Sequence, residues 1–223
     1  MKSKLQKSAI ALALGIGCIS AQATTLGVDS LSSSIDYSPV GFSGVLLASA
    51  ITSISNTSYN GIARAAVYDT GTGLDFYYQF SNSSTSKNGV GRMTGYDYSS
   101  LGSSSVETFQ TDAVFGIFIA GEEAADTSDR TAFGVIGFNF VPTLSSKVNP
   151  GTTSFTQIVR TNARTFQAGN FGLINGVGAN ADGFAPTTQV SAVPEPETYA
   201  MMLVGLGLIG TVARRRSKKL GAT

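Results

Sequence analysis

Short apolar runs separated by clusters of Gly, Ser, Asn and Asp fill the middle of the chain. At 132–141, Ile136, Phe138 and Phe140 recur at every second position, the period of a strand with one buried face. The run at 113–120 is apolar at nearly every position, which favours a central strand buried on both faces. In all, the pattern predicts strands at residues 42–53, 62–68, 74–80, 90–98, 113–120, 132–141, 154–160 and 165–174.

Turn signals separate these predicted strands, among them Asn60-Gly61 and the Asn-Pro-Gly sequence at 149–151. No amphipathic helix pattern is present between the two ends of the chain. Short strands at near-regular spacing, rich in Phe, Val, Ile, Tyr and Thr, are typical of two packed antiparallel sheets. We therefore predict an all-β fold, an antiparallel, jelly-roll-like β-sandwich, for residues 24–190.

The strand predicted at 74–80 is aromatic at most positions. Alternation divides it into two faces, with Phe76, Tyr78 and Phe80 on one and Asp75, Tyr77 and Gln79 on the other. Tyr77 is a candidate glycan contact, because aromatic planes and neighbouring amides suit carbohydrate. The alternative, which the frequency of aromatics in β-sandwich cores favours, is a core-facing aromatic set with an ordinary polar exterior.

The N-terminus has the three parts of a secretory signal peptide. Three lysines within the first seven residues precede an apolar core at 9–19. Ala21 and Ala23 are the small residues that signal peptidase recognises, so we predict cleavage after Ala23. Cys18 is the only cysteine and lies inside this segment, so the mature chain is predicted to contain no disulfide.

The C-terminus contains an apolar segment between a proline-rich motif and a basic cluster. Residues 199–213 carry no charge, and five basic residues lie within 214–219. Fifteen residues span about 22 Å as a helix, short of a hydrocarbon core of about 30 Å, but flanking cations and a thinner bilayer offset the difference. We predict a transmembrane helix whose basic end stays cytoplasmic, which places everything before residue 199 outside.

This tail resembles the PEP-CTERM sorting signal of Gram-negative bacteria: a Pro-Glu-Pro motif at 193–198, an apolar helix and an arginine cluster follow in the same order. The resemblance implies that an exosortase, a membrane-embedded transpeptidase-like enzyme, recognises the motif and cuts near it. It also implies an origin in bacteria that make exopolysaccharide and form biofilm. The sorting residues carried over are Pro194, Glu195, Pro196, Arg214, Arg215 and Arg216. The predicted organisation is a signal peptide at 1–23, a passenger at 24–190 and a sorting signal at 191–223.

An acidic segment at 121–130 joins two apolar runs and holds the one candidate metal site. Its carboxylates could ligate Ca²⁺, which prefers oxygen donors on a flexible loop, although the spacing matches no EF-hand. The alternative, which we favour, is a solvated hairpin loop. The four candidate ligands are Glu122, Glu123, Asp126 and Asp129, and no other cofactor is predicted.

Composition narrows the function classes. Residues 24–192 hold seven basic and twelve acidic residues, so no basic face for nucleic acid is predicted. The chain has no His, and its one Cys lies in the signal peptide, which excludes Ser-His-Asp and Cys-His catalysis and zinc sites built on those ligands. We therefore predict that the protein is not an enzyme. A glycosidase that uses two carboxylates is an alternative, since it needs neither residue type.

Together these features predict a protein exported across the inner membrane, anchored transiently by its C-terminal helix and then located at the cell surface or outside. Its processing partners would be signal peptidase and an exosortase. The leading functional hypothesis is a non-enzymatic component of the extracellular polysaccharide or biofilm matrix. The alternatives are a carbohydrate-binding or adhesive module and the carboxylate-type glycosidase.

Overall fold

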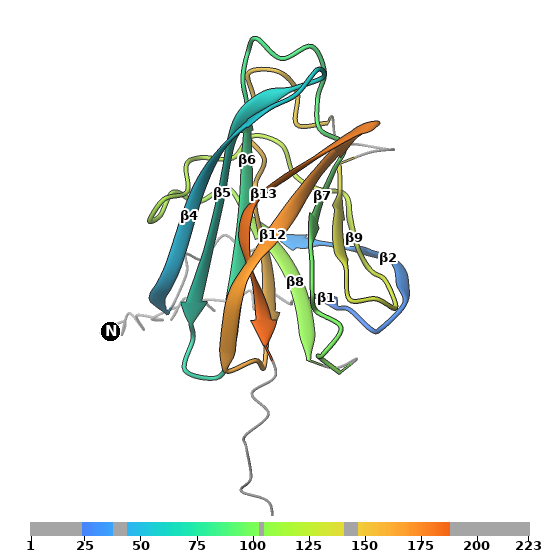
Figure 1. The fold of residues 1–223 in the computed structure, drawn as a ribbon. Coiled ribbons are helices and arrows are strands. Elements are labelled where there is room, and N and C mark those ends of the chain that lie inside the picture. The colour runs from blue at the N-terminus through green and yellow to red at the C-terminus, as the bar shows by residue number, and fades with distance from the viewer. Residues whose placement is uncertain (1–23, 38–43, 103–104, 141–146, 188–223) are drawn as a thin grey trace, which may run out of the picture. The chain divides into compact units, whose positions relative to one another are not determined.

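The structure, a computed structural model, describes residues 24–37, 44–102, 105–140 and 147–187. These residues form thirteen strands and no helix. The strands make two sheets in which all but one of the pairings are antiparallel, so the predicted all-β, two-sheet architecture is confirmed (Figure 1).

The first sheet, sheet A, is seven-stranded and carries the long central strands. β4, β5 and β6 follow one another as an antiparallel meander, whereas β11 and β8 join from later parts of the chain. β3 pairs with β8 in parallel. In sheet order the strands are β1 (Thr24–Thr25), β8 (Val106–Thr111), β11 (Thr156–Thr161), β6 (Leu74–Asn82), β5 (Asn60–Asp69) and β4 (Val45–Ser55), with β3 (Asp36–Tyr37) beside β8.

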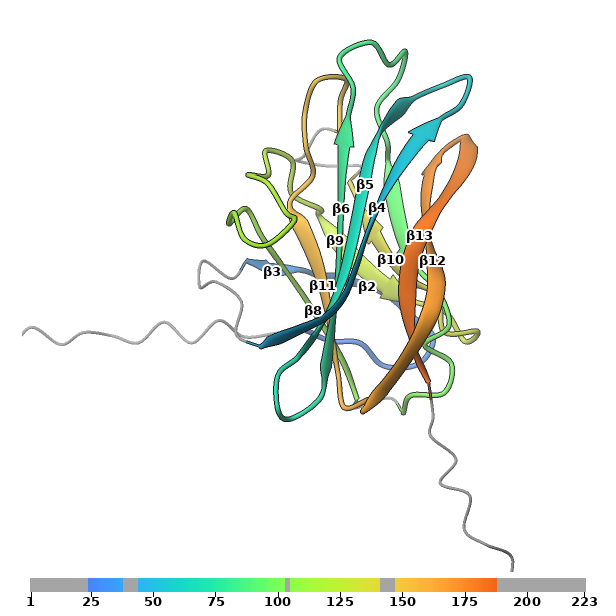
Figure 2. The ribbon, with the colours of Figure 1, turned by 60° about the vertical axis from the view of Figure 1, so that its left-hand side comes forward.

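The second sheet, sheet B, is six-stranded and contains one long hairpin. β12 and β13 pair along their whole length around Gly176, whose φ of 70° lies in the left-handed region that glycine adopts without a steric penalty. This hairpin packs against β4, β5 and β6 of sheet A (Figure 2). In sheet order the strands are β13 (Val177–Thr187), β12 (Thr165–Asn175), β7 (Arg92–Gly95), β10 (Ile136–Asn139), β9 (Thr127–Arg130) and β2 (Ser30–Ser34).

The main core lies between the two sheets, and the period-2 patterns identified it correctly. Ile136, Phe138 and Phe140 are all fully buried in it. The aromatic face predicted for β6 is there as well, since Phe76, Tyr78 and Phe80 belong to the same apolar cluster. The alternation in these two runs therefore predicted which side chains point inward.

The prediction of a central strand at 113–120 is wrong. Phe115 and Phe118 instead exchange backbone hydrogen bonds across a tight turn, with N–O distances of 3.3 and 2.8 Å. Gly116 adopts a φ of 53° in this turn, and the two rings stack with centroids 4.8 Å apart. The run is apolar because it covers the outer face of sheet A, where Phe118 packs with Tyr77 and Ile158 in a second apolar cluster.

Candidate functional site

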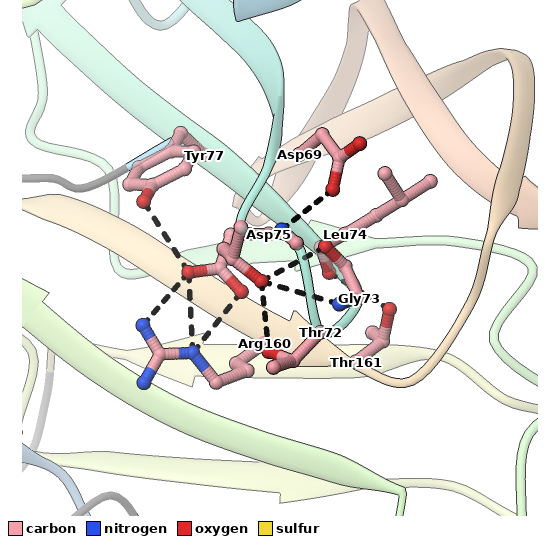
Figure 3. A network of polar contacts seen from close by, with 10 residues as sticks. Asp69, Thr72, Gly73, Leu74, Asp75, Tyr77, Arg160 and Thr161 are labelled. Atoms are coloured by element: carbon pink, nitrogen blue, oxygen red, sulfur yellow. Dashed lines mark hydrogen bonds and ion pairs between the residues drawn. The ribbon is translucent and has the colours of Figure 1, made fainter. Parts of the chain in front are cut away.

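The outer face of β6 carries a buried carboxylate paired with an arginine. Asp75 lies directly opposite Arg160 of the neighbouring strand β11. Arg160 Nε donates to both carboxylate oxygens at 3.1 and 3.2 Å, and Nη2 donates to Oδ2 at 2.9 Å (Figure 3). The Asp75 side chain is fully buried, whereas that of Arg160 is 43% exposed. The pair therefore presents a held guanidinium, but no accessible carboxylate, to solvent.

The pKa values of this pair follow from that geometry. Burial raises the pKa of Asp75, and the hydrogen bonds and charge of Arg160 act against that shift. Asp75 in turn raises the pKa of Arg160. Arg160 also lies over the ring of Phe109, 4.7 Å from its centroid. The guanidinium is thus fixed by a fork of hydrogen bonds and by an aromatic surface.

Tyr77, the candidate glycan contact, is only 1% exposed, so it does not form a sugar-binding face. The favoured alternative placed the aromatic set in the core, and Phe76, Tyr78 and Phe80 do lie there, but the opposite face is covered and not an ordinary polar exterior. Its hydroxyl lies 3.4 Å from Asp75 Oδ2, and its ring packs against Tyr68 and Phe115. Burial raises the pKa of Tyr77 far above its usual range. The alternation that put Tyr77 opposite the core is confirmed, but the segment after β8 covers that face.

Two glutamines hold the covering segment in place. Gln79 on β6 donates through Nε2 to the carbonyl of Ile119 at 2.7 Å, and its Oε1 accepts from the Ile119 amide at 3.1 Å. Gln110 makes the same paired contact with Ala125, at 2.9 and 2.8 Å. Each amide side chain thus replaces a strand partner for the loop backbone, which explains why polar residues are fully buried here.

An open pocket of about 290 Å³ lies beside Arg160. Every residue that lines it carries a polar side chain, and Glu107 supplies a carboxylate near the guanidinium. Arg160 Nη1 donates to none of the described residues, because the fork to Asp75 uses Nε and Nη2. The lining residues are Thr72, Ser105, Glu107, Arg160, Thr161 and Asn162.

The four candidate calcium ligands of the acidic segment do not come together. Glu122 Oε2 accepts from the Thr153 amide at 3.2 Å, whereas Asp129 binds Arg92 on sheet B. Among the described residues, no group of three or more His, Cys, Asp or Glu side chains could hold a metal ion. Glu123 forms an isolated backbone bridge with Ser154, and the buried Oδ2 of Asp126 has no hydrogen-bond partner. The structure therefore does not support a calcium site at 121–130.

The alternative of a solvated hairpin loop is also wrong for the second half of this segment, because Thr127–Arg130 is strand β9. Asp129 there accepts a two-pronged contact from Arg92, with N–O distances of 2.5 and 2.7 Å. Burial would raise the pKa of Asp129, but the hydrogen bonds from Arg92 and Asn139 outweigh it and hold the pKa below its ordinary value. A Cβ at Gly137 would lie 2.0 Å from the Arg92 guanidinium, so any side chain there would displace the guanidinium from its present position.

Arg130 is a buried residue that sequence reasoning missed. It is 1% exposed, and its guanidinium donates to four backbone carbonyls, those of Leu26, Tyr98, Leu101 and Gly102. Burial lowers its pKa. Its position at the end of an acidic segment indicated a solvated charge. The carbonyls come from residues 98–102 and from Leu26, which are distant in the chain and are brought beside Arg130 only by the fold.

Several predicted residues lie outside the described ranges. They are the cleavage residues Ala21 and Ala23 and the sorting residues Pro194, Glu195, Pro196, Arg214, Arg215 and Arg216. Within the described ranges no helix is long and apolar enough to cross a membrane, and the predicted transmembrane helix at 199–213 lies outside them.

Comparison with known proteins identifies the C-terminal segment. The family model of the PEP-CTERM protein-sorting motif matches residues 192–217. The motif implies that the protein is exported, carries a C-terminal sorting signal and is processed by an exosortase, which places it at the cell surface or outside. Searches of the curated proteins and of the solved structures gave no match for this chain.

Proposed function

We propose that the passenger at 24–190 is a non-enzymatic component of the extracellular polysaccharide matrix, delivered there by exosortase sorting. The observation that carries the proposal is the sorting motif at 192–217, attached to an all-β passenger. The absence of His and of a mature-chain Cys supports a non-catalytic role. Asp75 supports it too, because a fully buried carboxylate held by Arg160 is not free to exchange protons with a substrate.

Sorting is tested by replacing Pro194, Glu195 and Pro196 together with alanine in the producing bacterium. We expect the wild-type protein in the matrix fraction, with an intact mass that starts at Thr24 and ends near the motif. The variant is expected to stay in the membrane fraction and to retain Thr223, because the exosortase no longer recognises it. Intact-mass spectrometry of the membrane, matrix and medium fractions measures both outcomes.

Glu197→Ala is the matched control, since it removes a neighbouring carboxylate and leaves Pro-Glu-Pro intact. It should be processed like the wild type. A wild-type protein that keeps Thr223 in every fraction contradicts the sorting step. A matrix yield unchanged by deletion of the protein contradicts the matrix role, and hydrolysis of the producer's polysaccharide contradicts the non-enzymatic role.

A second candidate function, carbohydrate binding, is favoured by the pocket beside Arg160. Sugars are bound by planar polar side chains that meet neighbouring hydroxyls with paired hydrogen bonds. Arg160 offers Nη1 as a donor, and Glu107 offers an acceptor in the same pocket. One guanidinium faces two carboxylates, Asp75 and Glu107, so the local charge favours a neutral sugar over an acidic one.

Carbohydrate binding is tested with Arg160→Lys, which keeps the charge and loses the planar fork. We expect about tenfold weaker binding of neutral oligosaccharides from the producer's polysaccharide, since one good hydrogen bond corresponds to about that factor. Calorimetric titration of the exported protein measures the affinity. Arg92→Lys is the matched control, because it alters the other arginine–aspartate pair, on sheet B. Equal loss in both variants, or no binding by the wild type, contradicts this function.

A further inference from the structure

The two sheets end in strands that differ in how well they resist pairing with another chain. A terminal strand presents unpaired backbone N–H and C=O groups, and proteins usually protect them with charge, proline, bulges or short length. Within the described residues, sheet A ends at β4 on one side and at the short β1 and β3 on the other, and sheet B ends at β13 and β2.

Three of these edges carry such protection. β1 and β3 are two residues long. β2 has five residues and an irregular register between Ser30 and Ser33. β13 contains Asp182 and Pro186, which add a charge and remove a backbone donor. Each of these edges is therefore a poor template for a further strand.

β4 lacks these protections over most of its length. It has eleven residues, none of them charged and none proline, and β5 is its one strand partner in the described part of the chain. Its register shift lies near one end, between Leu46 and Ala48, and the pairing from Ser49 to Ser55 is regular. Four apolar side chains on this edge are exposed: Val45 by 68%, Leu46 by 46%, Leu47 by 45% and Ile51 by 60%.

We propose that β4 is a self-association edge, which pairs antiparallel with β4 of a second copy of this chain. A second copy is the partner that fits because an antiparallel strand pair around a two-fold axis is self-complementary. Ala50 is the central residue of β4, and we place the two-fold axis between the Ala50 residues of the two copies. Leu47 of one copy then lies across from Ser53 of the other, and the Ile51 side chains of the two copies are diagonal neighbours. Each exposed apolar group then gains an apolar or small neighbour.

Charge also favours a second copy over a charged partner. Because β4 has no ionisable side chain, two copies meet there without desolvating a charge, whereas a charged segment would find no partner for its charge. Residues 24–192 hold twelve acidic and seven basic residues, so two copies repel each other over a longer range. Asp182 lies beside the edge, where its Oδ2 accepts a hydrogen bond from Thr52 of β4 at 3.1 Å. Association is therefore strengthened by salt, which screens that repulsion.

The dimer is weak in dilute solution. One strand edge is smaller than the roughly 800 Å² per partner of a standard stable interface, so the dissociation constant is expected in the micromolar to millimolar range. Pairing through such an edge becomes significant where copies are held at high local concentration. This inference is independent of the matrix role, since self-association is measured on the purified exported protein.

Sedimentation velocity of the exported protein at increasing concentration tests the proposal. The weight-average mass is expected to rise toward that of a dimer, and to rise further at higher NaCl concentration. Ile51→Glu should weaken association at least tenfold, because it brings two carboxylates together at the two-fold axis. The monomer tolerates this change, since Ile51 is exposed and lies opposite Arg64 on β5.

Leu31→Glu is the matched control, because Leu31 is 89% exposed on β2, the short edge of sheet B with the irregular register. It should leave association unchanged. A protein that stays monomeric at every concentration and salt level overturns the proposal. The same conclusion follows if Leu31→Glu weakens association as much as Ile51→Glu, or if the mass passes beyond a dimer to open polymers.

Discussion

Arg130→Met is expected to lower the free energy of unfolding by about 3 kcal/mol. The carbonyls of Tyr98 and Gly102 keep a backbone donor, whereas those of Leu26 and Leu101 lose the guanidinium, and each buried carbonyl left without a donor costs roughly 1–3 kcal/mol. The guanidinium donates to four carbonyls at 2.5–3.4 Å, and methionine fills similar space without donating to any of them. For a domain of this size the melting temperature should fall by roughly 6–12 °C. Thermal unfolding followed by circular dichroism measures the shift.

Arg164→Met is the control for this prediction. Arg164 also donates to a backbone carbonyl, that of Gly71 at 2.9 Å, but it does so on the surface. Its replacement should change stability by less than about 0.5 kcal/mol, because water replaces the lost hydrogen bond. If Arg130→Met and Arg164→Met melt at the same temperature, Arg130 does not organise the 98–102 segment as its contacts indicate.

Tyr77→Ala is expected to lower the free energy of unfolding by about 3–5 kcal/mol, the usual range for removing a buried aromatic ring. The ring contacts Tyr68 and Phe115 at centroid distances of 4.9 and 5.6 Å and supports the segment that covers β6. Urea unfolding of the exported protein, followed by tyrosine fluorescence, measures the change. The same loss of packing would remove any binding activity indirectly.

Tyr77→Phe separates the ring from the hydroxyl. The hydroxyl makes a long contact of 3.4 Å with Asp75, so its removal should cost at most about 1 kcal/mol. Tyr37→Ala removes a tyrosine that is 46% exposed and should also cost less than Tyr77→Ala. A stable Tyr77→Ala variant would contradict the assignment of this ring to a second apolar cluster.

Side-chain alternation made the core residues predictable. Strands with polar sequences and loops with apolar sequences were assigned incorrectly. Phe138 and Phe76 lie in runs with clear period-2 patterns, so their burial followed from the sequence. β13 was missed because Gly, Asn and Asp weaken its pattern, although the Asn175-Gly176 pair before it is a hairpin signal. The segment at 113–120 was assigned wrongly because its apolar side chains do not share one environment: Phe118 is buried on sheet A, whereas Val114 is 69% exposed in the same run.

The candidate site was less predictable than the core. The sequence indicated that Asp75 and Tyr77 share a face, but Arg160 is 85 residues away in the chain, and only the pairing of β6 with β11 sets it opposite Asp75. In the acidic segment, four nearby carboxylates suggested a shared ligand set. The Asp129 carboxylate instead pairs with the Arg92 guanidinium, because the strands that carry them, β9 and β7, lie on either side of β10 in sheet B.

The sequence by itself determined the sorting segment at 192–217 and the all-β class, because both are encoded in residues that lie close together along the chain. A linear motif is recognised from the order of its residues alone, and a strand is recognised from the alternation of apolar and polar residues. The tertiary structure alone decided which polar groups are buried, where Arg130 finds its carbonyls and which strand ends each sheet. Those outcomes depend on contacts between distant segments, whose pairing is set by packing of the whole fold and not by any local pattern.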